Sequence, residues 1–145
     1  MKPKELLKKS YLVMQDVNYQ LFAESVREEC SLGIKGVDKE RVDQVLDELG
    51  LLDYADKHPN TLSGGQKQRL ALAVSIISKR KIIALDEPTS GLDYENMIRT
   101  SKIIKNLAND NKMIIIVTHD EEFIANCCNR VVRLDNTVEE LSCLF

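Results

Sequence analysis

The chain of 145 residues has no apolar run approaching the ~20 residues that a membrane-spanning helix needs. Its start, MKPKELLKKS, carries charges and lacks the apolar core of a signal peptide. Basic residues are not in excess, because the net charge is −3. This balance gives no electrostatic basis for binding nucleic acid or an anionic membrane. We therefore expect a cytoplasmic protein without a nucleic-acid partner.

The cysteines form no C-x-x-C pair. They lie at Cys30, Cys127, Cys128 and Cys143, and we expect buried, reduced thiols of a cytosolic protein. Internal repeats, low-complexity tracts and Gly/Ser linkers are also missing. The length fits one domain with a real core, and the 43% hydrophobic and 30% charged contents are ordinary for a soluble globular protein.

The spacing of apolar residues predicts several helices. In the stretch from Asp38 to Gly50, residues at i, i+3, i+4 and i+7 are apolar: Val42, Val45, Leu46 and Leu49. Asp38 is a suitable N-cap, and Gly50 stands where a C-cap belongs. Further helices are expected from near Gly65 to about Ser78, over residues 95–110, and around Phe123 to Cys128.

Short apolar runs alternate with these helices and predict strands at Tyr11–Met14, Ile82–Leu85, Met113–Val117 and 130–134. The run Met113–Val117 has no polar alternation, which is typical of a strand buried on both faces. Strands that alternate with helices imply parallel β-α-β units, so the C-terminal half is predicted to be α/β. The part from about residue 18 to residue 60 has helices but no clear strand, and we interpret it as a helical insert.

The stretch TLSGGQKQRLALA, residues 61–73, places Gly64 and Gly65 at the start of a predicted helix. Unsatisfied N–H groups and the positive end of the helix dipole favour an anion such as phosphate at this point. Glycine lets a ligand approach the backbone, and Ser63 adds a hydroxyl donor. The alternative is an ordinary helix cap with Ser63 as the N-cap, and the glycines alone favour that alternative.

Two carboxylates, Asp86 and Glu87, end a predicted buried strand in LDEPTSGLD. In parallel sheets, ligands bind at the carboxyl edge. Asp86 is a candidate for holding Mg²⁺, directly or through water, and Glu87 for orienting and deprotonating an attacking water. The alternative, which an isolated DEP sequence would favour, is a pair of solvated turn carboxylates before Pro88.

His119 follows the strand Met113–Val117, where its side chain, as neutral imidazole or as imidazolium, can donate a hydrogen bond to a terminal phosphate oxygen. Two alternatives are an ordinary exposed histidine and a capping box formed by Thr118 and Glu121. Gln15 follows the first predicted strand, where its amide can ligate Mg²⁺ or orient water, although a turn residue is the default interpretation. His58 is interpreted as structural.

Four motifs in this order resemble the nucleotide-hydrolysing part of an ATP-binding cassette (ABC) protein. LSGGQKQR (62–69) matches the ABC signature, and IIALDEPTSGLD (82–93) matches Walker B with the D-loop. IVTHD (116–120) matches the switch-histidine loop, and VMQD (13–16) matches the Q-loop. The resemblance extends from Tyr11 to Leu134, and a chance match to all four motifs is far rarer than a match to one.

The resemblance implies ATP and Mg²⁺ as cofactors and a role for each matching residue. Glu87 and His119 are the implied catalytic residues, and Asp86 and Gln15 the implied Mg²⁺ ligands. The signature binds nucleotide held by a partner subunit, through Ser63, Gly64, Gly65 and Gln66. The D-loop residues are Ser90 and Asp93.

The resemblance also implies partners and a location. The partners are a second ABC ATPase subunit, identical or different, and a transmembrane transporter subunit that holds the assembly at the inner face of the cell membrane. The stretch QDVNYQLFAESVREEC, residues 15–30, is similar to cassettes of the energy-coupling-factor group, which drive uptake of vitamins and metal ions.

The fold that the resemblance implies is α/β, a partial P-loop NTPase-like parallel sheet with a helical signature subdomain. The helical subdomain would span about residues 18–78, and about 1–17 and 79–145 would belong to the RecA-like core. A Walker A motif, G-x-x-x-x-G-K-[ST], is missing, because none of the six glycines precedes a lysine. LDNTVEELSCLF also lacks the glycine turn that usually follows the last strand.

Three functions remain open from the sequence. The chain is a truncated transporter ATPase subunit, a non-catalytic module that completes a partner cassette's ATP site, or a soluble ABC protein of DNA repair or translation. Without the phosphate-binding loop, we expect the chain alone to be inactive. We also expect apolar surface exposed on the parallel sheet, with self-association or limited stability as the result.

Overall fold

The computed structural model describes residues 5, 8–109, 112–133 and 142–144. The chain divides into two compact units. The first, which we call the sheet unit, comprises residues 1–15 and 80–145, and the second, the helical unit, comprises residues 16–79. Among the described residues, no helix is long and apolar enough to cross a membrane.

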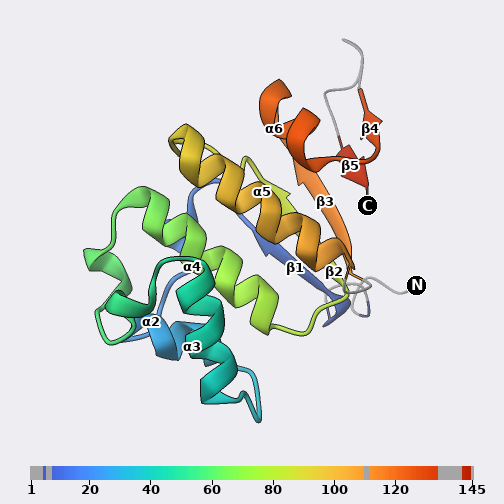
Figure 1. Ribbon diagram of the computed structural model, residues 1–145. Coiled ribbons are helices and arrows are strands. Elements are labelled where there is room, and N and C mark those ends of the chain that lie inside the picture. Colours follow the sequence, from blue (N-terminus) through green and yellow to red (C-terminus); the bar gives the residue numbers. More distant parts are fainter. Residues whose placement is uncertain (1–4, 6–7, 110–111, 134–141, 145) are drawn as a thin grey trace. The chain divides into compact units, whose positions relative to one another are not determined.

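The sheet unit contains a five-stranded sheet in the order β1-β2-β3-β5-β4 (Figure 1). Its strands are β1 (Ser10–Val13), β2 (Ile82–Asp86), β3 (Met113–Val117), β4 (Val131–Val132) and β5 (Ser142–Leu144). β1, β2 and β3 pair in parallel, which confirms the predicted parallel sheet. β5 is antiparallel to both β3 and β4 and was not predicted, because LDNTVEELSCLF has no clear strand pattern of its own.

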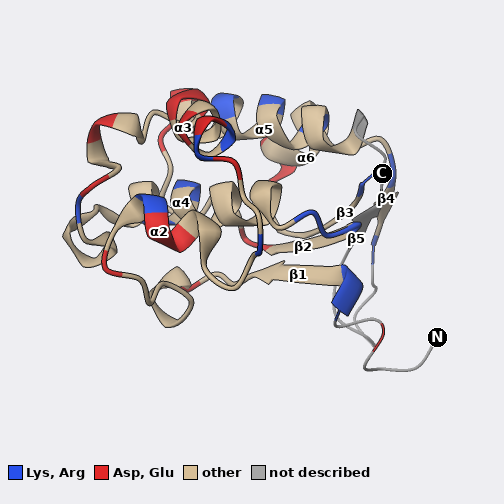
Figure 2. Cartoon of the chain, turned by 90° about the horizontal axis from the view of Figure 1, so that it is seen from below, with Lys and Arg blue, Asp and Glu red and all other residues tan. Residues whose placement is uncertain are grey.

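Two helices of the sheet unit, α5 (Tyr94–Asn109) and α6 (Glu121–Cys127), pack against each other, and α5 also contacts β3. Figure 2 shows both helices on one side of the strands. The strand residues that are fully buried alternate along the chain: Ile83, Leu85, Ile114 and Ile116. They share one face of the sheet, because Ile83 pairs with Ile114 and Leu85 pairs with Ile116.

The opposite face of the same strands is open and apolar. Its exposed members are Leu12, Met14, Met113 and Val117, with exposed fractions between 40% and 51%. Leu12, Met113 and Val117 alternate with the buried positions, so they lie on the other side of the sheet, and Met14 directly follows β1; we call this side the open sheet face. The expectation of exposed apolar surface is confirmed, whereas the prediction that Met113–Val117 is buried on both faces is wrong, because Met113 and Val117 at the two ends of β3 are 46% and 41% exposed.

The helical unit contains α2 (Val26–Ser31), α3 (Lys39–Glu48) and α4 (Gly64–Ile77), with short 3₁₀ turns at Val17–Tyr19, Leu52–Tyr54 and Pro59–Thr61. The unit has no strand among its described residues, as predicted for the insert. α4 packs against α2 and α3. Its eight residues from Leu70 to Ile77 are all buried.

The caps of α3 agree with the sequence. The Asp38 side chain accepts a hydrogen bond from the Glu40 N–H. At the other end Gly50 adopts a positive φ of 65°, its N–H donates to the Asp47 carbonyl, and the Leu51 N–H donates to the Leu46 carbonyl. This is the pattern of a Schellman cap. It favours glycine at this position because glycine has no Cβ, which is what disfavours the left-handed conformation in other residues.

Cys30 in α2 is fully buried, and this burial, followed by the charge of neighbouring Glu29, raises the pKa of its thiol to about 12, well above the ordinary value of a cysteine. Above about pH 9 the unfolded chain releases this proton while the native chain retains it. The free energy of unfolding should therefore fall as pH rises from about 9 toward 12, by up to about 1.4 kcal/mol per pH unit.

Urea unfolding at several alkaline pH values checks this prediction, with Cys30→Ala as the control. Other groups that titrate contribute equally to both proteins, so the difference between the wild-type and variant slopes isolates the thiol. Identical slopes would contradict the prediction.

Candidate functional site

The predicted residues of the sheet unit gather at the carboxyl edge of the parallel strands. β1, β2 and β3 run in the same direction, with Val13 paired to Leu85 and Asp86 paired to Val117. Asp86 is the last residue of β2, Gln15 lies two residues past β1, and His119 lies two residues past β3. Three chain segments far apart in sequence thus present polar side chains at one edge of the sheet.

Glu87 lies at the centre of this edge, and both of its carboxylate oxygens are engaged. Oε2 accepts a hydrogen bond from Thr118 Oγ1 at 3.0 Å. Oε1 lies 2.7 Å from His119 Nδ1. The Glu87 side chain is only 16% exposed, whereas that of His119 is 83% exposed. A solvated turn carboxylate therefore does not describe Glu87.

The backbone at Glu87 is unusual. Its φ is +46°, in the left-handed region that residues other than glycine rarely adopt. Its N–H donates to the Val117 carbonyl at 2.9 Å, and its carbonyl accepts from the Ser90 N–H at 3.1 Å. Such a conformation costs of order 1–3 kcal/mol, persists only where the surroundings enforce it, and clusters at functional sites. Here it turns the Glu87 side chain toward the end of β3.

The hydrogen bond to Glu87 fixes the tautomer of His119. An ionised carboxylate only accepts hydrogen bonds, so Nδ1 must carry a proton. In the neutral ring Nε2 is then an acceptor, and it becomes a donor only in the imidazolium form. While His119 is bonded to Glu87, it can donate to a phosphate oxygen only as imidazolium. This restricts the phosphate-binding role of His119 to its protonated form, whereas the sequence left both protonation states open.

The alternative of a capping box formed by Thr118 and Glu121 is wrong. Asp120 is the N-cap of α6, and its Oδ1 accepts from the Phe123 N–H at 2.9 Å. The Thr118 hydroxyl instead donates to Glu87 and accepts from the Asp120 N–H at 3.1 Å. The capping-box pattern did not apply because the Thr118 hydroxyl bonds to Glu87, which lies 31 positions away in the sequence.

Thr118, Asp120 and Thr89 are the site residues that the sequence reasoning missed. Asp120 Oδ2 accepts a hydrogen bond from Thr89 Oγ1 at 3.1 Å. Each of the three lies within two residues of Glu87 or His119, in DEPT or THD. Their position beside Glu87 and His119, together with their polar side chains, is the sequence signal that could have identified these three residues.

The D-loop residues are placed next to α5. Asp93 precedes the helix, and its two carboxylate oxygens accept from the Asn96 N–H and the Asn96 side-chain amide, both at 2.8 Å. Ser90 is exposed, and its backbone N–H is bonded to Glu87. Asp93 thus acts as a helix cap, so it has a structural role at the start of α5 in addition to the D-loop role that the resemblance implies.

In the helical unit, the glycine pair opens α4 as predicted, one residue earlier than expected. Ser63 is the N-cap: its Oγ accepts from the Gln66 N–H at 3.4 Å, and Gln66 Oε1 accepts from the Ser63 N–H at 2.9 Å. The alternative of a cap is therefore correct for Ser63. It does not explain Gly64, where an added Cβ would meet no atom within 4 Å and φ is not positive. The fold does not require glycine there, and the position is open to a ligand.

The residues at the sheet edge fit a magnesium ion that arrives with a nucleotide. Among the described residues, no group of three histidine, cysteine or carboxylate side chains could hold a metal by itself. Mg²⁺ is commonly bound by one or two carboxylates, waters and substrate phosphates, and does not need a complete protein cage. Asp86, half-buried at the end of β2, and Gln15, exposed beyond β1, meet that smaller requirement.

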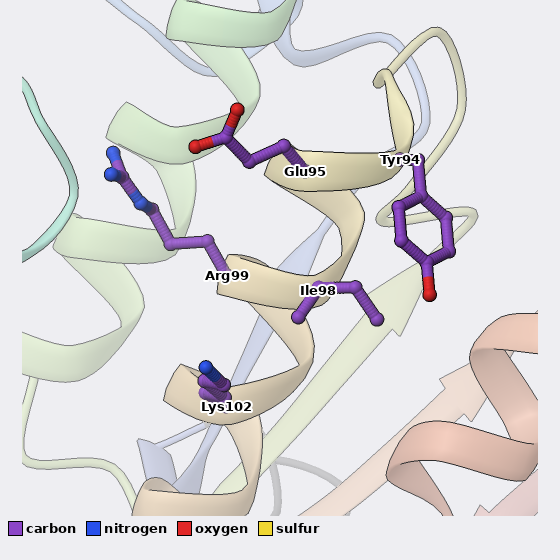
Figure 3. A pocket seen from close by; sticks show the side chains of 5 residues that line it. All are labelled: Tyr94, Glu95, Ile98, Arg99 and Lys102. Atoms are coloured by element: carbon purple, nitrogen blue, oxygen red, sulfur yellow. The ribbon is translucent and has the colours of Figure 1, made fainter.

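A hollow of about 380 Å³ lies elsewhere, on α5. Its lining residues are Tyr94, Glu95, Ile98, Arg99 and Lys102. Figure 3 shows these five side chains projecting from the single helix, with Glu95 and Arg99 on one side and Tyr94 on the other. It contains none of the candidate residues, so we do not place the site there.

Comparison with known proteins agrees with this geometry. The model of the ABC transporter family matches residues 2–90, from the start of the sheet unit through the signature to Ser90. The chain belongs to the ABC transporter family. The matched residues make up more than half of the chain and include the Q-loop and signature motifs and most of the Walker B motif, whereas the switch-histidine loop at 116–120 lies outside the match.

Related proteins carry the same family name. An ABC transporter ATP-binding protein of Treponema denticola is 53% identical over 126 residues, covering 87% of this chain and 26% of the relative. The energy-coupling factor transporter ATP-binding protein EcfA1 of Streptococcus pyogenes serotype M5 is 37% identical over 145 residues, covering 95% of this chain and 52% of the relative. The chain spans between about a quarter and about half of the length of these two ABC proteins.

Solved structures confirm the fold class. CbiO1 of Clostridium perfringens, described as part of the ABC transporter complex cbiONQ, matches with a TM-score of 0.72 and 32% identity, over 86% of this chain and 53% of CbiO1. MJ0796, a bacterial ABC transporter cassette described as dimeric, matches with a TM-score of 0.73 and 28% identity, over 88% of this chain and 61% of the cassette. The α/β sheet with its helices is a part of the ABC cassette fold.

Proposed function

We propose that this ABC chain acts in the ATP-binding subunit of a membrane transporter, which couples ATP hydrolysis to uptake. EcfA1 is named as an energy-coupling factor transporter protein, and CbiO1 is described as part of a transporter complex, which supports transport over a soluble role. The partners would be a second ATPase subunit and a transmembrane subunit, with the chain at the inner face of the membrane. The helical unit would serve as the signature subdomain and the sheet unit as the RecA-like core.

The carboxyl edge of the sheet supports the hydrolytic part of the proposal. Glu87 would orient and deprotonate the attacking water, and His119 would bind the terminal phosphate. Asp86 and Gln15 would hold Mg²⁺, which supplies charge neutralisation to the phosphates. The observation that carries this assignment is the strained, mostly buried Glu87 with both oxygens engaged by Thr118 and His119.

The N-terminus of α4 supports a role across a subunit interface. Ser63 and Gln66 fix the first turn through their reciprocal hydrogen bonds, and Gly64 leaves the turn open to an approaching phosphate. The signature residues Ser63, Gly64, Gly65 and Gln66 would contact nucleotide held by the partner's phosphate-binding loop. Ser90 and Asp93 of the D-loop would lie at the same interface.

A second candidate function is a non-catalytic module. The sequence has no lysine after any of its six glycines, so it offers no Walker A loop to hold a triphosphate. The residues at the sheet edge act on phosphates that such a loop positions. In this version the chain completes one composite site on an intact cassette and has no hydrolytic site of its own.

A complementation assay tests the shared part of both versions. A full-length homologous cassette that carries an intact Walker A motif but an inactivated signature serine is expected to hydrolyse ATP poorly by itself. Adding this chain supplies Ser63 and the glycine pair, so ATP hydrolysis should rise with the chain's concentration and saturate. An unchanged rate at saturating chain would count against the proposal.

A further inference from the structure

The single proton of the Thr118 hydroxyl is committed to Glu87. Thr118 Oγ1 has two partners, the Asp120 N–H at 3.1 Å and Glu87 Oε2 at 3.0 Å. A backbone N–H can only donate, so the hydroxyl accepts from Asp120. The hydroxyl proton therefore points at Glu87, and because Thr118 is only 3% exposed, water does not compete freely for it.

Asp120, which orients the hydroxyl, is itself held from two sides. Its Oδ1 accepts from the N–H of Phe123, a fully buried residue of α6. Its Oδ2 accepts from Thr89, two residues after Glu87 in the chain. A closed path of hydrogen bonds and backbone thus runs from Glu87 through Thr118, Asp120 and Thr89 back to Glu87, and it is anchored to the core by Phe123.

The two bonds to the Glu87 carboxylate differ in character. Thr118 holds Oε2 from a buried position within this path. His119 meets Oε1 with a side chain that is 83% exposed. The exposed ring gives up one hydrogen bond when it turns away, and water can replace that bond, whereas the buried hydroxyl cannot leave without breaking two hydrogen bonds.

We propose that Thr118 is a positioning residue that fixes the direction of the Glu87 carboxylate. When His119 turns toward a phosphate, Oε1 becomes available to the attacking water while Thr118 keeps Oε2 in place. The inference depends on the proposed function for this use of Glu87. The hydrogen bond from Thr118 to Glu87 is nevertheless present in the chain without nucleotide, and its effect on Glu87 is tested in that state.

The tautomer of His119 reports this hold. The chain has two histidines, His58 and His119, and the spectrum of a His119→Gln variant assigns the ring nitrogen signals to each. In ¹⁵N NMR at alkaline pH, where imidazole is neutral, wild-type His119 should show the form protonated at Nδ1. Thr118→Val keeps the shape but removes the hydroxyl, so the carboxylate should swing and the Nδ1-protonated form should be lost. Thr118→Ser retains the hydroxyl and should retain that form.

The order of these variants distinguishes positioning from packing. A packing role would favour Val over Ser, because Val preserves the methyl group and the volume of Thr118, whereas Ser loses the methyl group. Retention of the Nδ1-protonated form in Thr118→Val, or its loss in Thr118→Ser, would overturn the proposal. Thermal melts establish that each variant folds, and Thr118→Ala replaces Thr118→Val if the latter does not. The NMR experiment contains no nucleotide, so its result does not depend on the outcome of the complementation assay. Failure of the proposed function and failure of this inference can therefore be told apart.

Discussion

Gly64→Asp should abolish the ability of the chain to stimulate a signature-defective cassette while leaving its fold intact. An added side chain at Gly64 meets no atom within 4 Å, and an acidic residue in the first turn of α4 interacts favourably with the helix dipole. Thermal stability should therefore change by no more than about 1 kcal/mol. The same carboxylate would face the nucleotide phosphates and repel them, so we expect stimulation to fall by about 100-fold or more.

The control places an aspartate at the start of a different helix. Lys39 is the exposed first residue of α3, and Lys39→Asp should leave stimulation unchanged. ATP hydrolysis in the complementation assay is measured for both variants beside thermal melts. Equal activity of Gly64→Asp and the wild type would show that the α4 N-terminus does not meet phosphate.

Charging the open sheet face should convert an associating chain into a monomer. Leu12 in β1 and Val117 in β3, on either side of β2, are 51% and 41% exposed on this face, where an apolar surface gains free energy by association. Burying a large apolar side chain contributes about 1.5–3 kcal/mol. The double variant Leu12→Lys/Val117→Lys should therefore weaken self-association by at least about 100-fold, by the usual relation of 1.4 kcal/mol to a factor of ten.

Val131 provides the matched control. It is an apolar strand residue that is 44% exposed, but its register through β5 to Ile116 places it on the side of the sheet opposite the open sheet face. Val131→Lys should leave the association constant unchanged. Sedimentation equilibrium over a range of concentrations measures all three proteins. A wild-type chain that remains a compact, stable monomer at high concentration would contradict the prediction.

Local signals in the sequence predicted the elements that depend on local physics. The helix from Asp38 to Gly50 was predictable because its N-cap, apolar stripe and C-terminal glycine all lie within the same thirteen residues. The parallel pairing of β1, β2 and β3 followed from apolar runs separated by helices. The position of Asp86 and His119 at one edge followed in turn, because parallel strands share their carboxyl edge.

Elements that depend on distant partners could not be predicted in the same way. Val131–Val132 pairs with β5 and not with β3, and nothing in either short segment specifies that order. The Thr118 hydroxyl matched a capping pattern with Glu121, yet its partner is Glu87 in another segment. The exposure of Met113 and Val117 could not be predicted either, because a continuous apolar run occurs in strands that are covered on one face and in strands that are covered on both.

A titration of the purified chain with ATP and Mg²⁺, alone and with the signature-defective cassette, tests the central claim most directly. That claim is that the chain keeps the groups that act on bound phosphates but lacks the loop that holds them. We predict no saturable binding and no turnover by the chain alone, and tighter nucleotide binding by the mixture than by the cassette alone. Saturable ATP binding with sustained turnover by the isolated chain would contradict the account.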